Sequence, residues 1–162
     1  HNLAGILRPT SGMIKIFKNE ISKFSELKLD KFRGENIGIV FQKPHFVNSL
    51  TIGENLELAQ FLGQNKKGNI QVILDSLKIL DKINKKPKEL SQGEKQRASI
   101  AIAIINSPKL ILADEPTSSL DDGNCKNVIN ILKEQALKYN AQLVVITHDN
   151  RLKKYFKKSI AL

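Results

Sequence analysis

Two adjacent carboxylates, Asp114 and Glu115, directly follow the apolar run 110–113 (Leu-Ile-Leu-Ala). Placing charge at the end of an apolar strand is costly unless something there uses it. Such a carboxylate suits Mg²⁺, which proteins hold through one or two carboxylates together with waters and phosphates. The neighbouring carboxylate is then placed to act as a general base on water. A structural interpretation, in which both acids cap the following turn, stays open.

Two other polar side chains follow apolar runs in the same manner. Gln42 follows the run 36–41, and His148 follows Thr147 after the run 142–146. In open α/β sheets, ligands bind at the carboxyl ends of the strands. There the amide can bind a metal ion or orient water, and the imidazole can hydrogen-bond a terminal phosphate. The alternatives are a strand-terminating amide at Gln42 and a histidine satisfied near the core at 148.

A helix N-terminus is predicted within the stretch 90–97, Leu-Ser-Gln-Gly-Glu-Lys-Gln-Arg. Ser91 is in the position of an N-cap, and Glu94 completes a capping box three residues later. The free backbone N–H groups and positive dipole end of such a helix suit an anion such as phosphate. Taken alone, the stretch favours an ordinary capped helix, because capping boxes are common.

Strand-like runs alternate with helical patterns along much of the chain. We predict an α/β fold with a mostly parallel sheet, because such alternation implies right-handed crossovers between parallel strands. In the predicted helix at 123–139 we expect an apolar side formed by Val128, Ile129, Leu132 and Leu137. The other predicted elements are the end of a helix at 2–7, a strand at 13–17, a helix at 27–33, buried strands at 36–41, 110–113 and 142–146, a largely buried helix at 92–106, and a final strand at 159–162.

The segment 44–88 breaks this alternation. Two amphipathic helices are predicted in it, at 54–62 and 69–80, separated by the flexible stretch 63–68. We therefore predict an α/β core formed by 1–43 and 89–162, with 44–88 as an inserted helical subdomain.

Composition limits the class of protein. The 162 residues are 41% hydrophobic and 26% charged, with a net charge of +10 and one cysteine. This is the composition of a globular domain, and no apolar run is long enough to span a bilayer. Despite the positive charge, nucleic acid is not expected as a partner, because the lysines are scattered and few aromatic residues are interleaved with them.

Five motifs in order resemble those of the nucleotide-binding domain of ATP-binding cassette (ABC) transporters. The stretch 90–97 resembles the family signature, and 110–116 resembles the Walker B strand with its catalytic glutamate. Phe41-Gln42 resembles the Q-loop, Ser119-Leu120-Asp121 the D-loop, and Ile146-Thr147-His148-Asp149 the switch histidine. The resemblance covers nearly the whole chain and implies a P-loop NTPase-type fold.

The resemblance also implies a role for each site residue. Gln42 and Asp114 would hold Mg²⁺, Glu115 would be the general base, and His148 would contact the γ-phosphate of ATP. Ser91, Gln92 and Gly93 would reach ATP held by a second nucleotide-binding subunit in a head-to-tail dimer, with Asp121 at the interface.

A transmembrane permease is the other partner that the resemblance implies. Its coupling helix would enter the groove between the Gln42 loop and the helical subdomain, including residues 50–55. The subunit would then lie in the cytoplasm, peripheral on the inner face of the cell membrane.

The sequence departs from the family pattern at its start. The glycine-rich Walker A loop is nowhere in the sequence, and the strands that precede it are missing too. Because the chain begins at His1, we expect a piece of a longer protein, truncated within the family domain. In P-loop enzymes, backbone amides and a lysine of that loop surround the phosphates. The expectation is therefore an ATPase by family that is inactive as this piece alone.

Smaller departures bear on the choice of subfamily. Gln92 replaces a glycine of the commoner signature, and Ile102 stands where an arginine is frequent. The nearest resemblance is to lipoprotein-release and macrolide-export subunits, although Ser118-Ser119 differs from their usual Gly-Asn. The alternatives are a DNA-repair ATPase or a translation factor of the same superfamily, or an inactive regulatory fragment. The interval of about 50 residues from Gln42 to Ser91 is too short for the coiled coil of the repair enzymes.

Overall fold

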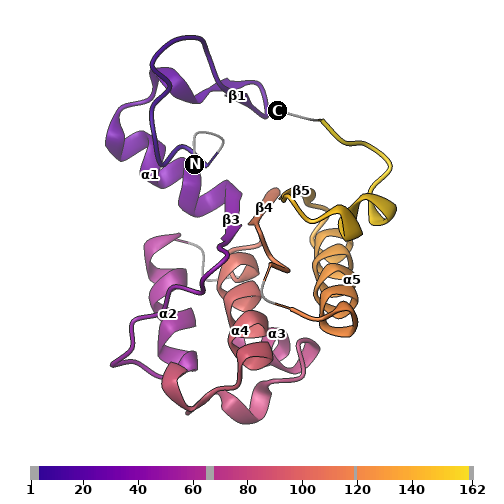
Figure 1. Cartoon of the computed structure of the whole chain (residues 1–162). Coiled ribbons are helices and arrows are strands. Elements are labelled where there is room, and N and C mark those ends of the chain that lie inside the picture. The colour runs from indigo at the N-terminus through magenta and orange to yellow at the C-terminus, as the bar shows by residue number, and fades with distance from the viewer. Residues whose placement is uncertain (1–3, 65–67, 119, 161–162) are drawn as a thin grey trace.

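The computed structural model describes residues 4–64, 68–118 and 120–160 (Figure 1). The strands in these ranges are β1 (Lys15–Ile16), β2 (Asn19–Glu20), β3 (Ile37–Val40), β4 (Leu110–Asp114) and β5 (Gln142–Ile146). The α-helices are α1 (Glu26–Asn36), α2 (Ile52–Leu62), α3 (Ile70–Ser76), α4 (Gln92–Ile104) and α5 (Asp122–Lys138). Short 3-10 helices lie at η1 (Ile21–Lys23), η2 (Leu80–Lys82), η3 (Pro87–Glu89) and η4 (Asn150–Tyr155).

The centre of the fold is a parallel sheet with the strand order β3-β4-β5. Val40 pairs with Ala113, and Asp114 pairs with Ile146, so the three strands end at one edge. The expected α/β class with a mostly parallel sheet is confirmed, and β1 and β2 form a separate antiparallel pair.

Each face of β4 contributes to a different hydrophobic cluster. Ile111 and Ala113 pack with α4, α5 and the helical segment that contains α2 and α3. Leu110 and Leu112 pack with α1 and β1 on the opposite face. Figure 1 shows the same arrangement, with α1 on one side of the sheet and α4 and α5 on the other. The division between a core and a subdomain at 44–88 stays a prediction, and the first cluster runs across that boundary without interruption.

β5 is less buried than the sequence predicts. Leu143 and Val145 are half-buried, whereas Val144 and Ile146 are 37% and 39% exposed on the other face. The prediction of a strand buried on both faces is wrong here, because the second cluster covers β3 and β4 but has no residue of β5. The prediction that Leu137 lies on the apolar side of α5 is also wrong, because this side chain is 83% exposed near the end of the helix.

Other predicted elements differ in length or kind. α3 ends at Ser76 because Leu77 leaves the helix and Lys78 takes a left-handed φ of 56°. After β5 the described part of the chain forms only the 3-10 helix η4, and the predicted strand at 159–162 is not formed at its described residues, 159 and 160. Of the helix end predicted at 2–7, residues 4–7 form turns and bends, and 2–3 lie outside the described residues.

The close contact of α4 with β3 depends on Gly38. A Cβ atom at this position would lie 2.0 Å from the carbonyl oxygen of Ala103 and 3.1 Å from the side chain of Pro108. The backbone of α4 can therefore approach β3 this closely only because residue 38 of the strand has no side chain.

We predict that Gly38→Ala destabilises the chain by roughly 1–3 kcal/mol or more, since overpacking forces the backbone apart. Chemical denaturation measures the change. Gly123→Ala is the matched control, because its Cβ would lie 3.4 Å from a carboxylate oxygen of Asp121, an ordinary van der Waals distance, and alanine favours the helix. Equal stability of the Gly38→Ala protein and the wild type would contradict the contact.

Candidate functional site

Four of the predicted site residues come together at the edge where the parallel strands end. Gln42 follows β3, Asp114 ends β4 with Glu115 next to it, and His148 follows β5 by two residues. This placement at the strand ends was expected from the sequence and is confirmed. Asp114 and Glu115 are half-buried, and His148 is exposed to solvent.

The Glu115 carboxylate joins the ends of β4 and β5. One oxygen, Oε1, accepts a hydrogen bond of 2.7 Å from the backbone N–H of His148. The other, Oε2, accepts one of 3.0 Å from the hydroxyl of Thr147. The backbone N–H of Glu115 also donates to the carbonyl of Ile146 at 2.9 Å. The side chain is thus held in one orientation by neutral donors.

The backbone of Glu115 has a left-handed conformation, with φ at 46°. A residue with a side chain is disfavoured there by about 1–3 kcal/mol, and such strain clusters at active sites. The hydrogen bonds to the loop after β5 stabilise this conformation. The strain is a second, independent reason to place function at Glu115.

Gln42 contacts the loop that follows Glu115. Its Nε2 donates to the hydroxyl of Ser118 at 3.0 Å. This bond uses the amide nitrogen, so the amide oxygen is the atom that suits a hard cation. Ser119, the first residue of the stretch that resembles the D-loop, lies outside the described residues.

Oxygen donors for Mg²⁺ lie at this edge, but they do not form a complete site. No group of three or more His, Cys, Asp or Glu side chains suited to a metal ion occurs among the described residues. The Asp114 carboxylate and the Gln42 amide fit Mg²⁺, which takes few protein ligands and keeps waters and phosphate oxygens.

The loop after β5 contains an ion pair that sequence reasoning missed. Arg151 donates to both oxygens of Asp149, through Nη2 at 2.7 Å and Nε at 3.0 Å. Thr117, which is fully buried, donates its hydroxyl to Asp149 at 3.2 Å. Chiefly because Arg151 donates these hydrogen bonds, the pKa of Asp149 falls from 3.8 to about 2. Nothing in the sequence pattern marked Arg151.

We predict that Asp149 makes the fold sensitive to acid. Because its pKa is lower in the folded chain, the stabilisation is fully present above about pH 4 and is lost as the pH falls toward 2. In Asp149→Asn, the free energy of unfolding should be lower at pH 7 and depend less on pH between 4 and 2. Urea denaturation across this range measures both effects, with Asp75→Asn, at an exposed residue of α3, as the control. An unchanged pH dependence in Asp149→Asn would contradict the prediction.

The predicted capping box at the start of α4 is confirmed. The backbone N–H of Glu94 donates to the Ser91 hydroxyl at 3.3 Å, and the backbone N–H of Ser91 donates to the Glu94 carboxylate at 2.8 Å. These bonds lower the pKa of Glu94, first through the backbone N–H of Ser91. Gln92 and Gly93 form the first turn of the helix.

Gly93 is not required by packing within the described chain. A Cβ atom there would have its nearest neighbour, Nη1 of Arg97, at an ordinary 3.7 Å. Glycine inside a helix is less favourable than alanine by about 1 kcal/mol. The helix stability lost by having glycine at position 93 is therefore not offset by any close contact that requires a glycine there.

α5 begins with another expected site residue. Asp121 is the N-cap, and its carboxylate accepts hydrogen bonds from the backbone N–H and side-chain amide of Asn124 at 2.9 and 2.7 Å. The backbone N–H of Asn124 is the main reason why the pKa of Asp121 is lowered. The observed contacts of Asp121 are those of a helix cap.

The loop before α2 is held by a buried asparagine. Asn55, 5% exposed, accepts from the backbone N–H of Val47 at 2.9 Å and donates to the carbonyl of Thr51 at 2.8 Å. A cavity of about 460 Å³ adjoins this region, lined among others by Thr51, Glu54, Glu57 and Ile83. Its lining does not include Gln42, so it is not the whole of the expected groove.

We predict that Asn55→Ala destabilises the chain by roughly 1–3 kcal/mol, because backbone groups of the loop lose their buried partners. Exposed Asn130 on α5 provides the control, and its replacement by alanine should leave stability nearly unchanged or raise it. Thermal unfolding measures both. Similar melting temperatures for the two variants would show that Asn55 does not support the loop.

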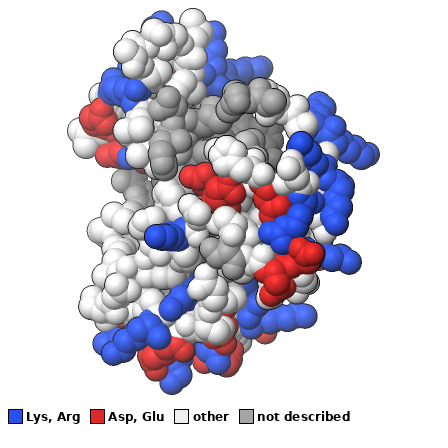
Figure 2. Space-filling view, in the orientation of Figure 1, with Lys and Arg blue, Asp and Glu red and all other residues white. Residues whose placement is uncertain are grey.

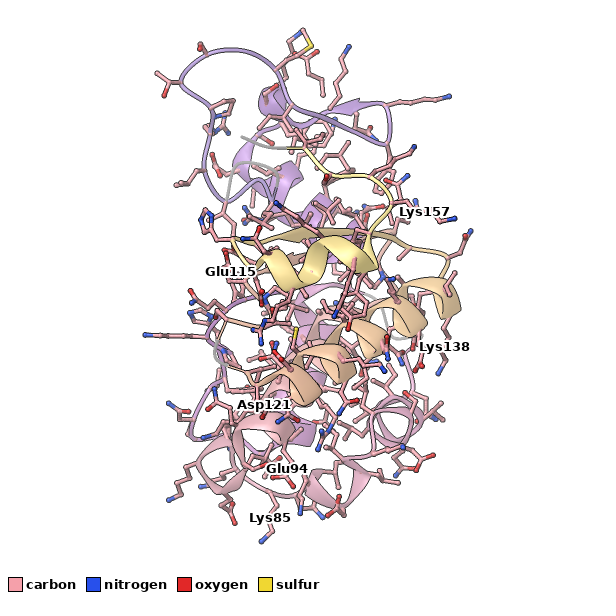
Figure 3. The ribbon with its side chains drawn as sticks, turned by 45° about the vertical axis from the view of Figure 1, so that its right-hand side comes forward. Lys85, Glu94, Glu115, Asp121, Lys138 and Lys157 are labelled. Atoms are coloured by element: carbon pink, nitrogen blue, oxygen red, sulfur yellow. The ribbon has the colours of Figure 1, made fainter. Side chains whose placement is uncertain are left out.

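Much of the positive charge lies on another side of the molecule. Figure 2 shows Lys and Arg along the side formed by α5 and the C-terminal segment. In Figure 3, Lys138 and Lys157 lie on the opposite side from Glu115 and Asp121. The net charge of +10 is therefore not concentrated around the candidate site.

The model of the ABC transporter family matches residues 1–118. The chain belongs to this family. It resembles LolD, the lipoprotein-releasing system ATP-binding protein, of Buchnera aphidicola, with 39% identity over 94% of this chain and 68% of the relative. LolD of Legionella pneumophila (strain Paris) is 34% identical over 94% of this chain and 69% of that relative. The family expectation is confirmed, and the repair and translation alternatives are not supported.

Solved structures agree with this assignment. A dimeric structure of the bacterial ABC transporter cassette MJ0796 has a TM-score of 0.82 and 29% identity, covering 94% of this chain and 69% of that one. Another MJ0796 dimer, in a post-hydrolysis state with ADP and phosphate, has a TM-score of 0.80 and 30% identity over the same shares. The fold is that of a P-loop NTPase, and the chain is of the ATP-binding subunit type. No helix in the described ranges is long and apolar enough to cross a membrane.

Proposed function

We propose that this chain works as one half of a head-to-tail pair of nucleotide-binding subunits. Ser91, Gln92 and Gly93 would contact ATP held by the second subunit, and Asp121 would lie at the interface. The observation that carries the proposal is Gly93, since an external group that approaches the helix backbone closely explains a glycine that internal packing does not require. The free N–H groups at the start of α4 suit a phosphate.

The strand edge would serve the nucleotide of this chain's own site. Glu115 would act as general base, because Thr147 and His148 hold its carboxylate at the end of β4. The exposed imidazole of His148 would contact the γ-phosphate and stabilise developing charge. Asp114 and Gln42 would hold Mg²⁺, which when bound would neutralise charge on the phosphates.

A membrane permease would be the third component. Its coupling helix would lie over the loop 44–51 and the start of α2, where Asn55 orders the backbone. This arrangement would place the chain on the cytoplasmic side, peripheral on the inner face of the membrane. The resemblance to lipoprotein-releasing subunits supports a substrate with a lipid anchor.

We predict that the chain alone binds Mg-ATP poorly and does not hydrolyse it, because its sequence has no Walker A loop. Calorimetry with Mg-ATP measures the affinity, and phosphate release measures hydrolysis. Micromolar affinity for the isolated chain would contradict this prediction.

The signature residues can be tested by complementation. The chain is mixed with Legionella pneumophila LolD whose own signature residues have been replaced, so that LolD pairs are inactive. We expect phosphate release from the mixture, because LolD would hold the ATP and this chain would supply Ser91 and Gly93. Gly93→Ala should abolish the gain without destabilising this chain, because the added Cβ would have its nearest neighbour at 3.7 Å. Gly123→Ala, at a glycine in the first turn of α5, should preserve the gain. If the mixture is inactive, the composite site is wrong.

A further inference from the structure

Arg151 joins two loops that carry different parts of the candidate machinery. It lies in η4, just after the loop with His148, and binds Asp149 with Nη2 and Nε. Its Nη1 reaches the segment after β4, where it donates to Asp122, the first residue of α5, at 2.6 Å and to the carbonyl of Leu120, in the loop before α5, at 3.3 Å. The guanidinium thus bridges the loop that follows β5 and the start of α5.

A continuous series of hydrogen bonds connects this bridge to Glu115. The backbone N–H of Asp149 donates to the Thr147 hydroxyl at 2.9 Å. The same hydroxyl donates to Oε2 of Glu115 at 3.0 Å. At the other end, Leu120 and Asp122 flank Asp121, the N-cap of α5. A displacement at Asp121 therefore has a route to the carboxylate of Glu115.

We propose that Arg151 is a positioning residue that couples the loop at Asp121 to the orientation of Glu115. This inference rests on the proposed roles of Asp121 at the subunit interface and Glu115 as general base. Docking of a second subunit at Asp121 would then adjust the general base through Arg151, Asp149 and Thr147. Assembly of the subunit pair would in this way change the orientation of the Glu115 carboxylate at the strand edge.

The geometry requires the fork of an arginine. Its separate N–H groups bind Asp149 on one side and the Leu120–Asp122 loop on the other. The compact ammonium group of a lysine binds as a point charge, so it can preserve one ion pair but cannot make both sets of directed bonds. Arg151→Lys should therefore maintain charge while it breaks the bridge.

The test is an NMR double-mutant cycle on the whole chain, which needs no nucleotide. Asp121→Ala removes the cap and disturbs the start of α5, and the backbone amide signal of His148, bonded to Glu115, reports the response. The signal should shift when Arg151 is present, and the shift should be lost when Asp121→Ala is combined with Arg151→Lys. Lys153→Gln, at an exposed lysine in the same 3-10 helix, should leave the shift intact.

Thermal unfolding distinguishes a loss of the coupling between Asp121 and His148 from a general loss of folded structure. Arg151→Lys should retain most of the wild-type melting temperature and still lose the response at His148, which loss of structure alone does not explain. The proposal is overturned if the response survives in Arg151→Lys, or if Asp121→Ala never shifts the His148 signal. The LolD complementation assay tests the roles of Ser91 and Gly93 independently, so failure of the composite site and failure of the coupling are distinguishable.

Discussion

β4 is hydrogen-bonded to a parallel strand on each side, and the arrangement of the candidate site depends on that pairing. Because parallel strands all point the same way, their carboxyl ends meet at one edge. The side chains of β4 alternate between two hydrophobic clusters, so a shift of one residue would exchange its buried faces. This burial fixes the register, and the register in turn brings Asp114 and Glu115 between Gln42 and His148.

Asp149 and Glu115 are two carboxylates near this edge, and they have different kinds of hydrogen-bond partner. Asp149 is bound to the cation of Arg151, and its lowered pKa reflects that pairing. Glu115 is held by a backbone N–H and a hydroxyl, which are neutral donors. An ion pair commits a carboxylate to its partner, whereas neutral donors orient the group and leave its charge uncompensated. This contrast suits Asp149 to a structural role and Glu115 to chemistry.

The start of α4 is a second functional feature, and it lies apart from the first. In Figure 3, Glu94 of its first turn is well separated from Glu115. Buried Gln96 links the two regions by donating to the carbonyl of Pro116 at 3.3 Å, in the turn after β4. The separation fits the proposed arrangement, in which the two features serve different nucleotides.

The sequence by itself determined the features that depend on neighbouring residues. The capping box of Ser91 and Glu94 spans three residues, and the apolar runs of β3 and β4 are continuous, so short-range patterns were sufficient. The motifs likewise identified the family, because each is a short stretch of sequence. Local patterns also predicted that polar residues follow the strands.

Only the tertiary structure decided which surfaces are covered and which distant residues meet. Exposure of β5 and of Leu137 depends on whether another segment packs there, and periodicity has no information about that. Arg151 binds Asp122, which is 29 positions away, through a contact that exists only after β4, α5 and β5 have packed. The sequence therefore showed which groups are suited to the chemistry, and packing decided how they are held, because directed bonds between loops depend on the relative placement of whole elements.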